Sequence, residues 1–283
     1  MHTFSAFDGT QLAYHVQGDA GVPVICLPGG PMRVSSYLGN LGGLSAGQPL
    51  VTLDLRGTGE SAIPADPATY RCDRQVDDVE ALRDHLALDR FDLLGHSAGA
   101  NLAVHYAVRY PERVRKLLLI TPSLRAVGLD VTDDMRRELI ALRRNEPWYA
   151  ETAAAFERLT TDDGTDADWD AIAPLRYGRW DAAAQADYAA NDSEINHDAA
   201  RVFGAPGVFD PEKTRAALAT VESPVLLLAG ELDLNTVPRV AAEYAALFPH
   251  AAFVVQPGAG HSPWLDDPDW FASTVAAFLA EDA

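Results

Sequence analysis

Cysteine is scarce in this 283-residue sequence, which holds only Cys26 and Cys72. Two thiols do not make a disulfide framework or a metal-ligand cluster, and Cys26 lies in an apolar run typical of a protein core. The first sixteen residues lack the basic segment and apolar stretch of a secretory signal, and no apolar run approaches the ~20 residues that span a bilayer. We therefore expect a soluble cytoplasmic protein that requires no metal and no cofactor.

Basic residues are also in short supply. The sequence has 22 Lys and Arg against 41 Asp and Glu, which gives a formal net charge of −19. Such an excess repels nucleic acid and anionic membranes, so we expect neither as a partner. An acidic surface that aids solubility explains the charge, and carboxylates that face a cationic substrate are the alternative. Charge alone does not choose between them, and the sequence does not indicate an oligomeric state.

Short apolar runs that end in Gly, Pro or Asp recur along the chain, and 48% of the residues are hydrophobic, enough for a large core. Asp8-Gly9 separates the first two runs and predicts a β-hairpin. The later runs are continuously apolar, as in strands of a buried parallel sheet. The eight candidate strands are 3–7, 11–16, 22–29, 49–57, 90–95, 113–121, 223–230 and 251–258.

Helical patterns lie between several of these runs, as in the apolar spacing of residues 74–88. The alternation predicts an α/β fold with an eight-stranded, mostly parallel sheet and helices on both faces. The interval 123–219 breaks the rhythm, since it has helical patterns without a strong strand. We expect it to form a helical cap over the carboxyl ends of the strands, on a core built from 1–122 and 220–283. Further helices are expected at 98–110, 135–144, 147–159, 180–191, 237–247 and 270–279.

Ser97 is the candidate nucleophile. It lies in Gly95-His96-Ser97-Ala98-Gly99, between an apolar strand pattern and a helix pattern. Strand, sharp turn and helix are the context that gives the G-x-S-x-G pattern its meaning. The small residues permit the turn, which projects the hydroxyl into a cleft at a helix N-terminus. The alternative is a structural turn that happens to contain serine.

A serine hydroxyl needs a base that takes its proton, and eight histidines compete for that role. His261 lies just past the end of a predicted strand, in Pro257-Gly258-Ala259-Gly260-His261-Ser262-Pro263. The glycines permit an exposed loop that brings the imidazole to the edge of the sheet, although an ordinary polar loop residue is the alternative. His96 neighbours the nucleophile, so we expect its side chain to point away from that of Ser97.

Asp233 is the candidate acid that orients the histidine. It follows the run at 223–230 and gives the chain order serine, acid, histidine, with Glu231 as the nearest rival. The oxyanion of acyl transfer needs backbone donors already in place. We expect these to be the amides of Ala98, just after the nucleophile, and of Gly30.

These motifs resemble the α/β-hydrolase superfamily over nearly the whole chain, and within it the proline iminopeptidase group. Residues 27–31, Leu-Pro-Gly-Gly-Pro, are similar to that group's His-Gly-Gly-Pro-Gly, and residues 54–61, Asp-Leu-Arg-Gly-Thr-Gly-Glu-Ser, to its Asp-x-Arg-Gly-x-Gly-x-Ser loop. Pro28 and Met32 replace a histidine and a glycine of the group. The elbow also reads Gly-His-Ser-Ala-Gly in place of Gly-Gly-Ser-Trp-Gly.

The resemblance implies that carboxylates of the cap bind the free amino group of the substrate. Glu194 lies in a segment similar to the group's Glu-Asn-His, and Glu146 beside Pro147 is the second candidate. A carboxylate on the surface of a helical lid is the alternative for both.

The leading hypothesis is a serine hydrolase that cleaves the amide next to a proline or another small N-terminal aminoacyl group. Its substrate would be a small molecule or short peptide, and the reaction would pass through an acyl-enzyme. The second hypothesis keeps the triad in an esterase or lactonase for a hydrophobic small molecule. The third is a binding protein of the same fold that does no chemistry, and the intact triad speaks against it.

Overall fold

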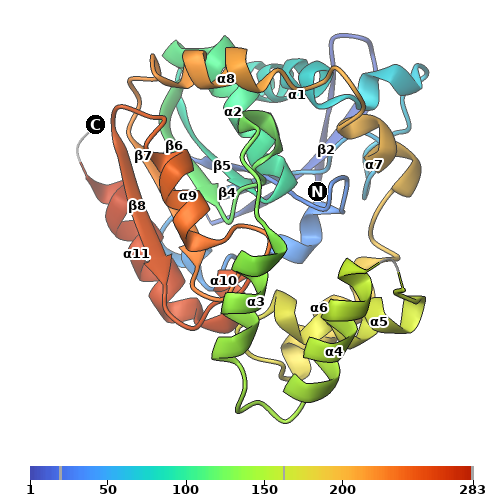
Figure 1. Cartoon of the computed structure of the whole chain (residues 1–283). Coiled ribbons are helices and arrows are strands. Elements are labelled where there is room, and N and C mark those ends of the chain that lie inside the picture. Colours follow the sequence, from blue (N-terminus) through green and yellow to red (C-terminus); the bar gives the residue numbers. More distant parts are fainter. Residues whose placement is uncertain (19–20, 162, 282–283) are drawn as a thin grey trace.

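One β-sheet forms the centre of the molecule in the computed structural model, which describes residues 1–18, 21–161 and 163–281 (Figure 1). Across these residues eight strands lie in the order β1-β2-β4-β3-β5-β6-β7-β8. The β1–β2 and β2–β4 pairs are antiparallel and the other pairs are parallel, so the predicted mostly parallel sheet is confirmed. The strands are β1 (His2–Ser5), β2 (Gln11–Gln17), β3 (Val24–Leu27), β4 (Leu50–Leu53), β5 (Phe91–His96), β6 (Val114–Ile120), β7 (Val225–Gly230) and β8 (Ala251–Gln256).

Helices cover both faces of the sheet, which explains why its central strands are continuously apolar. In β6, Leu117 and Leu119 join the apolar cluster that contains α1, α2 and α9, whereas Leu118 and Ile120 join the one that contains α11. Each fully buried side chain of this kind contributes roughly 1.5–3 kcal/mol. Within the described residues, no helix is long and apolar enough to cross a bilayer. The covering helices are α1 (Cys72–His85), α2 (Ala98–Arg109), α8 (Pro211–Leu218), α9 (Pro238–Ala245) and α11 (Pro268–Ala280).

The chain between β6 and β7 contains the helices expected of a cap, and α3 to α6 gather at one end of the molecule (Figure 1). Ile140, Phe156 and Leu175 form a small apolar cluster of their own there. Phe203 and Leu218, from the later helices α7 and α8, belong instead to the large apolar cluster that also contains residues of α1, α2 and α9. The division at 123–219 stays a prediction. The helices of this interval, besides α8, are α3 (Asp133–Leu142), α4 (Tyr149–Thr160), α5 (Asp166–Ala171), α6 (Ala182–Asn191) and α7 (His197–Phe203).

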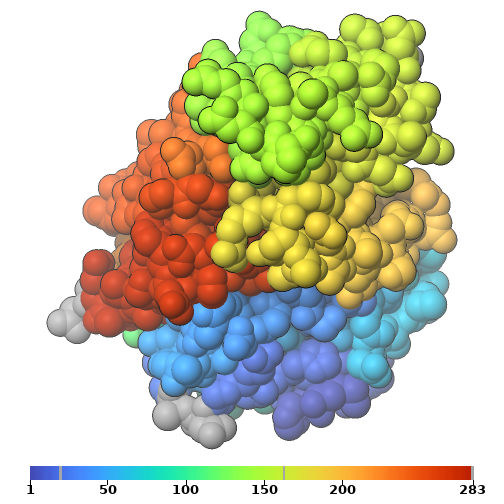
Figure 2. Space-filling model, turned by 90° about the horizontal axis from the view of Figure 1, so that it is seen from below, coloured from blue at the N-terminus to red at the C-terminus, as the bar shows by residue number. Residues whose placement is uncertain are grey.

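The insertion is fastened to the loop that follows β8. Asp266, in the short helix α10 (Pro263–Asp266), accepts hydrogen bonds from the amides of Gly178 at 2.8 Å, Arg179 at 3.1 Å and Gly260 at 2.7 Å. Burial raises the pKa of the Asp266 carboxyl above its usual value, against the effect of these amides. In Figure 2 the yellow surface of the insertion borders both the red C-terminal elements and the blue N-terminal part. The insertion therefore rests directly on the loop that carries His261.

Candidate active site

Ser97 occupies a strained turn between β5 and α2. Its backbone has φ 51° and ψ −119°, a conformation that costs an L-residue about 1–3 kcal/mol. The neighbouring strand and helix leave no room for side chains on either flank. A methyl group at Gly95 would stand 2.7 Å from Cα of Ala100, and one at Gly99 would stand 2.5 Å from the carbonyl oxygen of Pro28. The two glycines therefore allow the strained turn that presents the serine hydroxyl.

His261 and Asp233 reach Ser97 from the loops that follow β8 and β7. The Ser97 hydroxyl donates to His261 Nε2 at 2.9 Å, and His261 Nδ1–H donates to Asp233 Oδ2 at 2.8 Å. Parallel strands bring their carboxyl ends to one edge of the sheet, so loops distant in sequence meet there. Asp233 is 1% exposed and His261 is 9% exposed. The three side chains singled out in the sequence thus form one hydrogen-bonded chain.

The rival acid, Glu231, points elsewhere. It is exposed, and its Oε2 accepts a hydrogen bond from the amide of Gly258 at 2.7 Å. Asp233 is held from its other side by the amide of Asn235, which donates to Oδ1 at 2.8 Å. Asp233, and not Glu231, is therefore the carboxylate in contact with the imidazole.

A second chain of hydrogen bonds links the loop of Gly29 to the loop of His261. The Gly29 amide donates to the Tyr37 hydroxyl at 2.7 Å, and that hydroxyl donates to His96 Nδ1 at 2.5 Å. His96 Nε2–H then donates to the His261 carbonyl at 2.9 Å, and the Thr121 hydroxyl donates to the same oxygen at 2.9 Å. Burial, with the charge of His261, holds the pKa of His96 well below its usual value, so the ring stays neutral. His96 fixes the loop of His261, a role that sequence reasoning missed.

Gly30 and Ala98 both line the cavity that also includes Ser97. Among the described residues, neither amide donates a hydrogen bond to a protein acceptor. Ala98 is the first residue of α2, where a helix leaves its amides unsatisfied. Two free N–H groups next to a nucleophile are what a developing oxyanion requires.

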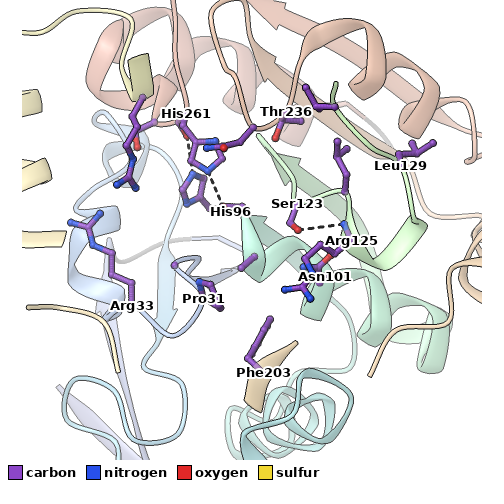
Figure 3. A pocket seen from close by; sticks show the side chains of 18 of the residues that line it. Pro31, Arg33, His96, Asn101, Ser123, Arg125, Leu129, Phe203, Thr236 and His261 are labelled. Carbon is purple, nitrogen blue, oxygen red and sulfur yellow. Dashed lines mark hydrogen bonds between the residues drawn. The ribbon is translucent and has the colours of Figure 1, made fainter. Parts of the chain in front are cut away.

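A cavity of about 380 Å³ opens beside Ser97 and His261 (Figure 3). Figure 3 shows Arg33 on one side of His96 and Arg125 on the other, with Phe203 below. In the described part of the chain, no group of three His, Cys, Asp or Glu side chains is placed to hold a metal ion. The apolar lining of the cavity includes Leu124, Leu129, Val131, Phe203 and Phe209. The charged lining consists of Arg33, Arg125, Arg136, Arg176 and Asp130.

Neither glutamate expected to bind substrate lines this cavity. Glu194 Oε2 accepts a hydrogen bond from Arg33 Nε at 2.8 Å, so its charge is paired with a guanidinium. Glu146 lines a separate hollow of about 590 Å³ next to Gly258. The described residues of the interval 123–219 thus present three arginines and one carboxylate, Asp130, to the cavity, and neither of the two glutamates that the family resemblance suggested.

Comparison with known proteins places these features in a family. A family model described as "alpha/beta hydrolase fold" matches residues 22–268. The chain is 27% identical to a proline iminopeptidase of Lactiplantibacillus plantarum, over 97% of this chain and 98% of the relative. It is 28% identical, over 96% of each protein, to a putative 2-succinyl-6-hydroxy-2,4-cyclohexadiene-1-carboxylate synthase of Bacillus subtilis.

Solved structures show the same likeness. The proline iminopeptidase of Mycobacterium smegmatis superposes with a TM-score of 0.76 at 25% identity, and the match covers 98% of this chain and 97% of that one. The α/β-hydrolase fold and the resemblance to proline iminopeptidases, both predicted from the sequence, are confirmed.

Proposed function

The chain belongs to the alpha/beta hydrolase fold family, and from this premise we propose that it is a serine hydrolase of small esters or amides. Ser97 is the nucleophile, His261 the general base and Asp233 the acid that orients the base. The observation that carries this proposal is the unbroken hydrogen-bonded chain from Ser97 Oγ through both nitrogens of His261 to Asp233 Oδ2, with links of 2.9 and 2.8 Å.

Acylation begins when Ser97 Oγ bonds to the carbonyl carbon of the substrate and its proton passes to His261 Nε2. The imidazolium that forms is stabilised by the Asp233 carboxylate, which already accepts the Nδ1 proton. His261 then gives the proton to the leaving alcohol or amine as the C–O or C–N bond breaks. The product of this half-reaction is an acyl-enzyme on Ser97.

The oxyanion formed at each step would be bound by the amides of Gly30 and Ala98. Loss of one such donor costs ~10²–10³ in rate. In deacylation, a water molecule gives a proton to His261 and attacks the acyl carbon. The proton returns to Ser97 Oγ as the acid product leaves, so the enzyme is restored.

Covalent labelling of the nucleophile tests this proposal. A fluorophosphonate probe should label the wild-type protein at one site, and Ser97→Ala should abolish the label. Ser123→Ala is the matched control, because Ser123 also lines the cavity but has no histidine partner among the described residues. Labelling that survives Ser97→Ala, or is lost equally in the control, would contradict the assignment.

The acyl group is a separate question, and an N-terminal aminoacyl amide is one candidate. The names of the Lactiplantibacillus and Mycobacterium relatives support it. A free amino group needs a carboxylate, and Asp130 is the carboxylate on the cavity wall among the described residues. An esterase or lactonase with the same triad is the other candidate.

Arylamides of proline and alanine, compared with simple aryl esters, separate these candidates. Turnover of the arylamides, with a raised KM in Asp130→Asn, supports an aminoacyl substrate. Turnover of the esters alone refutes that substrate and leaves the triad mechanism standing.

A further inference from the structure

Two arginines on the cavity wall form no ion pair with any described carboxylate. Arg125 donates one side-chain hydrogen bond, to the Gly204 carbonyl at 3.0 Å, and its guanidinium lies 5.7 Å from the Phe209 ring centroid. Arg176 donates one, to Asn191 Oδ1 at 3.5 Å. Because a guanidinium carries five N–H donors, most donors of both side chains are left for a ligand.

The other two arginines of the cavity are already neutralised. Arg33 forms ion pairs of 2.7 Å with both Asp187 and Glu194. Arg136 forms an ion pair of 2.8 Å with Asp133. Unpaired positive charge therefore remains at two defined places on the wall, in a chain whose formal net charge is −19.

The surroundings of Arg176 favour tight pairing with an anion. The side chain is half-buried, and it also lines a neighbouring hollow of about 430 Å³. That hollow has apolar walls that include Phe156, Trp169 and Ile172. An ion pair beside apolar surface is screened less than one in open water. Asp130, the carboxylate of this cavity, is exposed, as is Arg125, so solvent screens both of these charges more strongly than that of Arg176.

We propose that the cavity selects substrates that carry a carboxylate, bound by Arg176 with Arg125 as a second anchor. The planar guanidinium matches a carboxylate through two parallel hydrogen bonds, which gives orientation as well as affinity. The proposal rests on the serine-hydrolase function, since it names the substrate class of that same site. The carboxylate lies either on the acyl group or on the leaving group, and two pairs of substrates separate these cases.

The experiment measures kcat/KM for matched charged and neutral aryl esters. The first pair is the 4-nitrophenyl esters of succinic and butyric acid, which differ in a carboxylate on the acyl side. The second pair is the acetate esters of 3-hydroxybenzoate and phenol, which differ on the leaving side. The wild-type protein should prefer the charged member of one pair, and Arg176→Gln should reduce that ratio roughly 10- to 100-fold.

Arg144→Gln is the matched control, since Arg144 is an exposed arginine of the same insertion that does not line the cavity. It should keep the wild-type ratio. Added salt should lower the ratio, because it screens the pair. The ratio itself guards against a misfolded variant, since damage to the fold lowers both rates together.

The outcomes separate the two proposals. A wild-type preference for neutral members of both pairs, or an unchanged ratio in Arg176→Gln, overturns the carboxylate proposal while ester turnover and labelling of Ser97 uphold the hydrolase. Absence of both turnover and labelling overturns the hydrolase function, and the carboxylate proposal with it.

Discussion

Replacement of Asp233 by asparagine tests the orientation of His261, the proposed general base. Asp233 uses both oxygens: Oδ1 accepts the amide of Asn235 at 2.8 Å and Oδ2 accepts His261 Nδ1–H at 2.8 Å. An asparagine has one oxygen, and the Asn235 amide is a donor that requires it. The NH₂ group of the introduced side chain must then face His261, which forces the imidazole to carry its proton on Nε2. That tautomer cannot accept the proton of Ser97.

The expected loss in kcat is ~10⁴-fold, which corresponds to a barrier higher by about 5.5 kcal/mol. The free energy of unfolding should change little or rise, because Asp233 is 1% exposed and the substitution removes a buried charge. Steady-state turnover of an aryl ester and urea unfolding, measured on the same preparation, separate these effects.

Glu231→Gln provides the control, because the exposed Glu231 bonds to Gly258 and should keep activity within a few-fold of the wild type. More than a tenth of the wild-type kcat in Asp233→Asn would refute the tautomer argument. An equal loss in Glu231→Gln would refute the choice of acid.

Three further predictions concern the framework of the site. Gly99→Ala should lower the free energy of unfolding by about 1–3 kcal/mol, because the added methyl group would overlap the carbonyl of Leu27. Urea titrations measure this change, and an unchanged midpoint would show that the turn can relax. Tyr37→Phe should lower the free energy of unfolding by about 1–3 kcal/mol and also lower kcat, since it leaves the Gly29 amide and His96 Nδ1 without partners. Full activity at wild-type stability would show that the hydroxyl does not support the site. Because burial depresses the pKa of His96, the unfolded chain binds a proton below pH ~6.5 that the folded protein does not. The free energy of unfolding should therefore fall as the pH drops from 6.5 towards 5, by up to ~1.4 kcal/mol per pH unit. Urea unfolding at pH 7.5, 6.5 and 5.5 should show a shallower fall in His96→Gln, and equal slopes would contradict this reasoning.

The strands of the sheet could be predicted from the sequence because each strand is marked by the pattern of its own neighbouring residues. A run such as residues 117–120 is apolar at every position, since alternate residues enter opposite layers, and a strand buried on both faces has that pattern. The elbow is local as well, because the two glycines and the serine lie within five residues of one another. The short helices α5, α7 and α10 were not predicted, since segments of four to seven residues hold too few turns for an apolar period.

The charge that the cavity wall presents to a ligand could not be predicted, because each charged side chain is either paired or unpaired depending on which residues the fold brings beside it. Glu194 lies in a segment similar to one that binds an amino group in the family, yet it pairs with Arg33, 161 residues away. Tyr37 belongs to no motif, and its role appears only when the loop of Gly29 and the end of β5 at His96 meet around its hydroxyl. A single sequence shows that an arginine is present and does not show whether a carboxylate has already neutralised it.

Arg176 connects the insertion to both parts of the proposed chemistry. Its backbone carbonyl accepts the His261 amide at 2.7 Å, while its side chain lines the cavity. Two residues further along, the Gly178 amide donates to Asp266 Oδ1 at 2.8 Å, which fastens the same segment. A substrate anion bound by the guanidinium would therefore act on a segment that also holds His261, the proposed general base. Substrate binding and the alignment of the proposed base would then involve the same residue, so substrates that engage Arg176 should gain in kcat as well as in affinity.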